Sequence, residues 1–153
     1  MSAADCLHGS AVAFELCDGW AGVLILGRSG SGKSGLALEL IGQGARLVAD
    51  DQTELRRDGD CIRLSAPAAL RGRIELRGLG LLRVAPVSGV PLVLVVDQDR
   101  PEPVRLPPRH HMELLGLRLP LLKTCPDRAF AIGVACYVKA RQWQDEDPSD
   151  VPA

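Results

Sequence analysis

The sequence predicts an α/β domain of the P-loop type, with a mixed β-sheet and few helices. Two observations indicate this. An apolar run at residues 23–26 leads directly into a glycine-rich segment and then into residues that favour a helix. Further along, short apolar stretches separated by turn residues replace the regular alternation of strands and helices. The second half of the sheet is therefore expected to be mixed instead of regularly parallel.

The first half predicts a strand–helix–strand unit. Residues 11–16 and 22–26 are expected strands joined by a turn, and the second is apolar on both faces, as a buried central strand would be. Residues 33–41 are rich in Ala, Leu and Glu and are followed by the stop signals Gly42 and Gly44, which predicts a helix. Residues 46–49 form the next strand, and a right-handed parallel unit is the default arrangement.

The second half predicts a hairpin and further strands. Residues 53–57 and 61–64 flank a turn at Asp58-Gly59, and strands are expected at 74–84 and 90–96. Residues 109–115 are expected to form a short helix, and 129–141 a longer one. The acidic residues 144–153 are expected to be a disordered tail, which leaves 1–143 as the domain.

Composition restricts the classes of function. The chain has 153 residues, is 46% hydrophobic and carries a net charge of −1, so no overall field attracts nucleic acid or an anionic membrane. Its five cysteines are scattered without metal-ligand or redox spacing, which favours reduced thiols. No apolar run is long enough to span a bilayer, and no leader peptide is recognised. We expect a cytoplasmic protein.

The glycine-rich segment matches the phosphate-binding loop at every fixed position. Glycines allow backbone amides to wrap around phosphates, and the following helix adds the positive end of its dipole. The lysine reaches the β- and γ-phosphates, and the serine hydroxyl ligates Mg²⁺. The sequence therefore predicts binding of ATP and Mg²⁺ by Gly27, Arg28, Ser29, Gly30, Ser31, Gly32, Lys33 and Ser34.

Acidic residues follow two apolar strands, where a P-loop protein needs a carboxylate to hold magnesium. Asp50 and Asp51 end one strand, and Asp97 ends another. One member of the adjacent pair can serve the metal while the other takes a proton from an attacking hydroxyl. Glu75 and Arg77 share one face of a later strand, which suits an acid for metal beside an arginine for phosphate.

In four segments the chain resembles the catalytic domain of the HPr kinase/phosphorylase family. These segments are His8-Gly9, the phosphate loop with the helix after it, residues 46–51, and residues 74–80 with the sequence IELRGLG. The last is the most diagnostic, because P-loop proteins in general do not share it. The likeness extends over residues 8–141 and suggests a short form without the N-terminal domain of the family.

The resemblance implies an enzyme that phosphorylates a serine of the phosphocarrier protein HPr with ATP, and that can remove the phosphate with inorganic phosphate to give pyrophosphate. It also implies that a hexamer is possible. Carried over, Asp50 and Asp51 provide the base, Ser34 and Glu75 hold the metal, and Lys33 steadies the transferred group. The remaining residues that it places at the catalytic centre are His8, Arg77, Arg105 and Arg128.

One loop departs from the family pattern. Residues 123–128 keep Pro126 and Arg128 of the segment associated with phosphorolysis, but Asp127 stands where the family has glycine. An added carboxylate repels phosphate, which disfavours the reverse reaction.

Two alternative functions remain open. A small-molecule kinase would need an arginine-bearing lid, which Arg100, Arg105, Arg109 and Arg118 can supply. A regulatory module would bind nucleotide without turnover. A guanine-nucleotide switch is disfavoured, because the chain has no asparagine for the base-reading motif.

Overall fold

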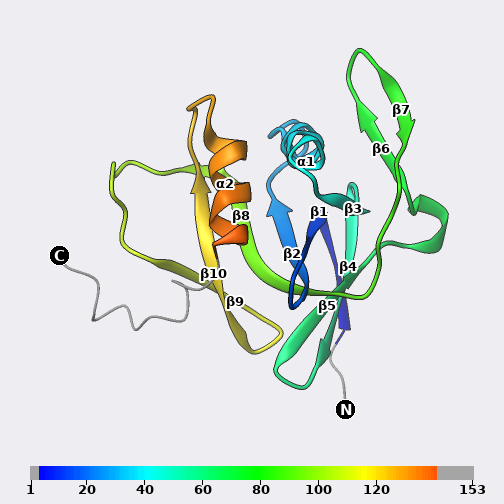
Figure 1. Ribbon diagram of the computed structural model, residues 1–153, viewed down its shortest axis with the longest axis horizontal. Helices are drawn as coiled ribbons and strands as arrows, with labels where there is room; N and C mark the ends of the chain where they lie inside the picture. Colours follow the sequence, from blue (N-terminus) through cyan, green and yellow to red (C-terminus); the bar gives the residue numbers. More distant parts are fainter. Residues whose placement is uncertain (1–3, 141–153) are drawn as a thin grey trace.

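The computed structural model describes residues 4–140 (Figure 1). The predicted tail at 144–153 and the end of the predicted helix 129–141 lie outside this range. Within it, a mixed sheet with two α-helices confirms the predicted fold class. The elements are β1 Ala4–Leu16, β2 Gly19–Leu26, α1 Lys33–Gly42, β3 Arg46–Ala49, β4 Gln52–Asp58, β5 Cys61–Ser65, a 3-10 turn Ala68–Leu70, β6 Arg73–Leu76, β7 Gly80–Arg83, β8 Val90–Pro101, β9 His110–Leu114, β10 Leu117–Thr124 and α2 Phe130–Lys139.

The two long strands β1 and β8 hold the eight-stranded sheet together, because each changes partners along its length. Residues 4–8 of β1 pair with β4, and residues 9–16 pair with β2. The beginning of β8 pairs with β5, and its continuation runs parallel to β2. The pairings therefore close a ring in the order β2, β1, β4, β5, β8 and back to β2.

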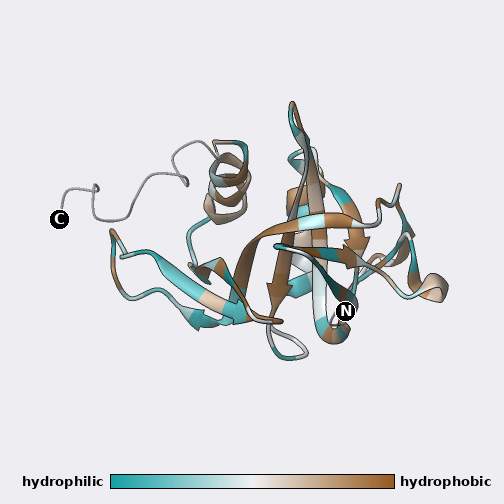
Figure 2. Cartoon of the chain, turned by 90° about the horizontal axis from the view of Figure 1, so that it is seen from below, coloured by the Kyte–Doolittle hydropathy of each residue, from teal (hydrophilic) through white to brown (hydrophobic). Residues whose placement is uncertain are grey.

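Both faces of the central strands are buried. On one face, Ile25 and Leu94 pack with α1 and α2, which lie together over the sheet (Figure 1). On the other face, Leu24 and Val95 pack with residues of β4 and β5 inside the ring. Figure 2 shows hydrophobic residues along much of the strands at the centre of the molecule. The doubly apolar sequence of β2 follows from this arrangement.

Three parallel strands end at the same edge of the sheet. β2 and β10 both run parallel to β8, with Leu26 beside Asp97 and Leu122 beside Val96. Ligands of open α/β sheets bind outside such carboxyl ends. β3 is parallel to β2 as predicted, since both are antiparallel to β1, but β1 lies between them. The glycine-rich segment begins at this edge.

Two predictions of secondary structure are wrong. Residues 109–115 do not form a helix: His110–Leu114 is strand β9, and it pairs antiparallel with β10, which the sequence analysis missed. Pairing with β10 overrides the local helical preference. Residues 74–84 are not one strand but the hairpin of β6 and β7, where Gly78 and Gly80 both have φ of 92°. The other predicted elements are confirmed, but β1 begins at Ala4 instead of residue 11 and β8 continues to Pro101 instead of residue 96.

Candidate active site

The glycine-rich segment joins β2 to α1 at the carboxyl edge of the sheet. Gly30 and Gly32 have φ of 84° and 93°, which side-chain-bearing residues rarely adopt. Gly32 precedes α1, and no side chain of the described residues caps this helix. The first amides of a helix have no partner inside it, and its dipole makes this end positive. The turn can therefore bind an anion such as a phosphate.

Lys33 folds back along the loop. Its side chain is buried, with 7% exposure, and Nζ donates to the carbonyl oxygens of Gly27 at 2.7 Å and Arg28 at 2.9 Å. Nζ also lies 3.4 Å from Nε2 of His8, which comes from β1. These contacts fix the ammonium group beside the anion-binding turn, where it can neutralise phosphate charge.

Two residues near the end of β8 support the loop, and the sequence analysis did not name them. The amide of Arg28 donates to both carboxylate oxygens of Asp99, at 3.1 and 3.0 Å. Nε2 of Gln98 donates to the carbonyl of Gly32 at 3.4 Å. The sequence signal for this region is the acidic stretch after the apolar run 93–96, and Asp97 is its first acid. Asp97 receives the Asp99 amide at 2.9 Å and pairs with Arg100 at 3.4 Å.

Asp50 is a buried carboxylate surrounded by donors. Its Oδ1 accepts hydrogen bonds from Ser34 Oγ and from Ser10 Oγ, both at 2.7 Å, and its Oδ2 accepts one from the Glu75 amide at 3.2 Å. The residue is 8% exposed, and Ser10 is fully buried. Sequence reasoning missed Ser10, because a serine in an apolar strand carries no distinguishing pattern. This network fixes the position of Asp50 relative to the phosphate loop.

Asp51 differs from its neighbour in both exposure and backbone. Its side chain is 69% exposed and lies 3.3 Å from Nδ1 of His8. It has φ of 70°, and the amide of Gln52 donates to the Asp50 carbonyl at 2.8 Å, which closes a tight three-residue turn. With the hydrogen on Nδ1, His8 donates to Asp51 and accepts from Lys33. An exposed carboxylate is thereby connected to the phosphate loop through one imidazole.

The donor set at Ser34 and Asp50 fits a magnesium ion. Mg²⁺ commonly takes one or two protein carboxylates together with waters and substrate phosphates, in place of a complete protein cage. Within residues 4–140, no group of three His, Cys, Asp or Glu lies close enough together to hold a metal ion. Ser34 Oγ and Asp50 Oδ1 are adjacent and lie at the mouth of the anion-binding turn. A metal held there would lie against bound phosphate.

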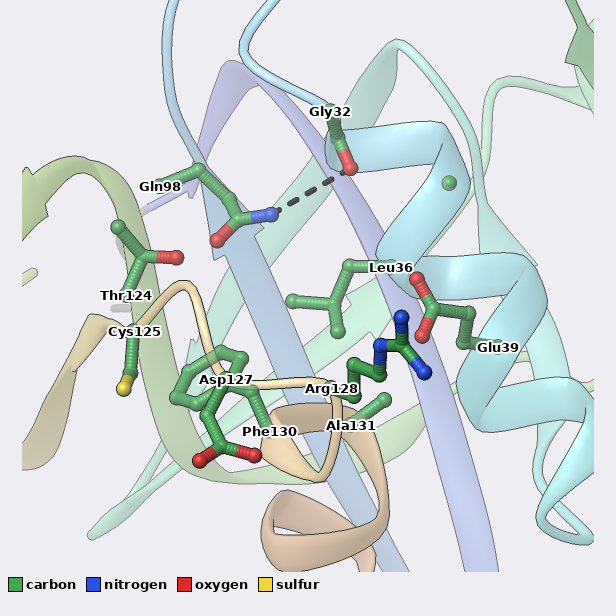
Figure 3. Close-up of a pocket in the computed structure, with 11 residues that line it drawn as sticks. Gly32, Leu36, Glu39, Gln98, Thr124, Cys125, Asp127, Arg128, Phe130 and Ala131 are labelled. Atoms are coloured by element: carbon green, nitrogen blue, oxygen red, sulfur yellow. Dashed lines mark hydrogen bonds between the residues drawn. The ribbon is translucent and has the colours of Figure 1, made fainter.

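The structure does not bring all the predicted residues into contact with the loop. Glu75 reaches Asp50 through its backbone amide, while its side chain is exposed. Arg77 lies at the exposed turn of the β6–β7 hairpin, and Arg105 lies in the exposed segment between β8 and β9. Arg128 lines a cavity whose wall includes Gly32 of the loop (Figure 3). The roles of these four residues stay predictions.

Asp127, the departure from the family pattern, has a local structural contact. Its Oδ1 accepts the Ala129 amide at 2.7 Å, and its carbonyl accepts the Phe130 amide at 3.1 Å. An aspartate that bonds to the backbone two residues ahead is a common way to start a turn. The carboxylate therefore shapes the entry to α2.

The comparisons with known proteins agree with this geometry. The family model described as HPr serine kinase C-terminal domain matches residues 1–98. The chain belongs to this family. Among members of the HPr kinase family, the HPr kinase/phosphorylase of Caldanaerobacter subterraneus subsp. tengcongensis is 54% identical over 70 residues, which is 45% of this chain and 23% of that protein. That of Geobacillus thermodenitrificans is 40% identical over 120 residues, 70% of this chain and 38% of that protein.

A solved structure shares the fold. The structure of the HPr(Ser) kinase/phosphatase from Coxiella burnetii aligns with a TM-score of 0.75 and 24% identity, over 94% of this chain and 99% of that one. The curated HPr kinase relatives are longer, since this chain spans 23% and 38% of the two described above. Among the described residues, no helix is long and apolar enough to cross a membrane.

Proposed function

We propose that this chain is an ATP- and Mg²⁺-dependent kinase that phosphorylates a serine of HPr. The observation that carries the proposal is the meeting of three groups at one edge of the sheet: the anion-binding turn with Lys33, the Ser34–Asp50 pair, and the exposed carboxylate of Asp51. Membership of the HPr kinase family supports the choice of substrate over a small metabolite.

The two aspartates have different roles in this proposal. Asp50 receives three hydrogen bonds and is buried, so its lone pairs are committed to positioning and to the metal. Asp51 faces solvent, with His8 as its side-chain neighbour, so an incoming serine hydroxyl can reach it. Asp51 therefore accepts the hydroxyl proton, and His8 holds the carboxylate in place. Bound Mg²⁺ would neutralise phosphate charge, while the loop amides and Lys33 orient the transferred group.

The proposal includes a cytoplasmic location and allows a hexamer. The described residues include five cysteines, all free, which suits a reducing compartment where ATP is available. The family resemblance alone suggests the hexamer, and sedimentation analysis of the purified chain measures it. The reverse, phosphorolytic reaction is expected to be weak, because the Asp127 carboxylate lies in the loop associated with it.

The test is a transfer assay with matched variants. Incubation with HPr, ATP and Mg²⁺ should give phosphoserine, and later addition of phosphate measures the reverse reaction. We expect Asp51→Asn to lower transfer by about 10²-fold or more, the usual contribution of a general base, while ATP binding persists. Asp60→Asn, on the exposed turn between β4 and β5, is the control and should retain full activity.

Different failures have different meanings. Full transfer by Asp51→Asn would reject Asp51 as the base. Transfer to a metabolite but not to HPr would establish the small-molecule kinase instead. ATP binding without transfer to HPr or any metabolite would leave the nucleotide-sensing module.

A further inference from the structure

A cavity of about 360 Å³ opens beside the phosphate loop, and the proposed chemistry does not use it. Gly32 and Gly35 form its wall next to the loop, and Leu36 and Glu39 continue the wall along α1. At 1.5 Å per residue, the distance from Gly32 to Glu39 along the helix is about 10 Å. The cavity is therefore long enough to hold a group attached to phosphates that occupy the loop.

The cavity lies at the edge of the sheet where the parallel strands end. Gln98 near the end of β8, Thr124 at the end of β10 and the first residues of α2 form the side opposite α1 (Figure 3). β10 runs parallel to β8, and β8 runs parallel to β2, so all three strands deliver their carboxyl ends here. This is the crevice in which α/β sheets bind their ligands.

The walls combine apolar surface with polar edges. Leu36, Phe130 and Ala131 supply apolar contacts. Glu39 and Arg128 lie at the end away from the loop, with the guanidinium directed toward the carboxylate in Figure 3. Small-molecule sites typically pair such apolar walls with a few polar groups that fix orientation. A flat ring with hydrogen-bonding edges suits this lining better than a chain of phosphates.

Among the described residues that line the cavity, one buried polar atom lacks a partner. Nε2 of Gln98 donates to the Gly32 carbonyl, but Oε1 of the same amide is buried and has no hydrogen bond among the described residues. A buried acceptor without a donor is costly, so such atoms commonly mark a missing ligand or water. A sugar hydroxyl or a ring amine next to the phosphates would supply the donor.

We propose that this cavity binds the nucleoside part, ribose and base, of the triphosphate whose phosphates lie on residues 27–34. The proposal rests on the proposed function, because it takes the phosphate site as given. It adds that the affinity for ATP comes from two separable places: a phosphate site at the loop and a nucleoside site between α1 and α2.

Two glycines of α1 provide a matched test. Gly35 lines the cavity, whereas Gly42 lies at the far end of the same helix. Neither has a positive φ, and a Cβ built on either meets nothing within 4 Å. Gly35→Met should therefore fill the cavity without a backbone clash, and Gly42→Met should add a side chain of equal size outside it.

Calorimetric titration compares Mg-ATP with Mg-tripolyphosphate, which has no nucleoside. The wild-type chain should bind ATP at least about tenfold more tightly, since buried apolar contacts and polar pairing add to the phosphate contacts. Gly35→Met should remove most of that difference and keep its affinity for tripolyphosphate, and Gly42→Met should behave as wild type. Equal binding of the two ligands by wild type, or an unchanged preference in Gly35→Met, would overturn the nucleoside site. No binding of either ligand would instead overturn the phosphate site.

A second measurement needs no variant. Cys125 lines the cavity and is exposed, and Cys17 is exposed at the turn between β1 and β2. Mass spectrometry of alkylated peptides should show that Mg-ATP slows modification of Cys125 several-fold, that Mg-tripolyphosphate does not, and that Cys17 is unaffected by either. Modification of Cys125 at an unchanged rate under saturating ATP would contradict the proposal.

Discussion

Asp51 has a backbone conformation that few residues other than glycine adopt. Its φ of 70° puts it in the left-handed region, and the bond between the Gln52 amide and the Asp50 carbonyl holds it there. Such strain costs about 1–3 kcal/mol and persists where the surrounding structure requires it, commonly at functional sites. In the proposed mechanism this backbone conformation directs the carboxylate of Asp51 toward His8 and the mouth of the loop.

This conformation predicts that two substitutions of Asp51 differ in stability but not in activity. Asp51→Gly should be more stable than Asp51→Ala by about 1 kcal/mol, because glycine adopts positive φ without the penalty of a Cβ. Both variants should be equally deficient in transfer to HPr, since both lack the carboxylate. Urea denaturation of the two variants measures the difference. Equal stability, or a more stable Asp51→Ala, would show that the turn carries no strain.

The presence of a site at Asp50 and Asp51 could be predicted from the sequence, but its division into two roles could not. Two acids after an apolar strand and near a phosphate loop are a local signal. The burial of Asp50 depends on Ser10, which is 40 positions away and lies on another strand. The side-chain contact of Asp51 likewise depends on where β1 places His8. Contacts between distant segments decide such details, and a single sequence does not contain them.

At the scale of elements, a contact between His110 and Glu102 joins the two ends of the segment between β8 and β9. Nε2 of His110 lies 2.8 Å from Oε2 of Glu102, and both side chains are largely covered, with 24% and 11% exposure. Burial raises the pKa of Glu102, but the hydrogen bonds from His110 and the Val104 amide, together with nearby positive charge, lower it further than burial raises it. The net direction is a pKa below the ordinary value.

This shift predicts a loss of stability in acid. A carboxyl group with a lower pKa in the folded state contributes stability above its unfolded pKa, and loses it as the pH falls through the folded pKa. Below about pH 4.5, the melting temperature of wild type should therefore fall more steeply with decreasing pH than that of Glu102→Gln, which has no carboxylate to protonate at this position. Parallel melting curves for the two proteins across this range would contradict the assignment.

Local patterns predicted the elements whose partners are nearby and failed where the partner is distant. The β4–β5 hairpin follows from its turn residues, and α1 from its composition. β10 contains Pro120, and proline disfavours a strand interior. In the structure Pro120 pairs with His111 of β9, and β8 joins only at the next residue, Leu121. The proline therefore lies where only one side of β10 is paired.

At the scale of the whole molecule, closure of the sheet by the β8–β2 pairing makes two cores share a single layer of strands. Neighbouring residues of β2 contribute to opposite cores. Leu24 belongs to the core inside the ring, Ile25 belongs to the core under the helices, and both have no exposed surface. A sheet with one solvent-facing side would leave one of them exposed.

This arrangement predicts that adjacent substitutions are equally severe. Leu24→Ala and Ile25→Ala should each lower the free energy of unfolding by about 2–5 kcal/mol, the range for aliphatic residues in cores. Ile132→Ala, on a side chain of α2 that is 50% exposed, is the control and should change it by about 0.5 kcal/mol or less. Chemical denaturation followed by circular dichroism measures all three. A cost below about 1 kcal/mol at either β2 position would show that its face is not packed.

The carboxylate of Asp50 joins three segments that lie far apart in the sequence. Ser10 arrives from β1, Ser34 from α1, and the Glu75 amide from the β6–β7 hairpin, which forms a small sheet of its own. The hairpin also buries Ile74 in the core under the helices, so its position relative to Asp50 is held by core packing as well as by this hydrogen bond. Any movement of the hairpin would therefore also move one of the three hydrogen-bond donors of the Asp50 carboxylate.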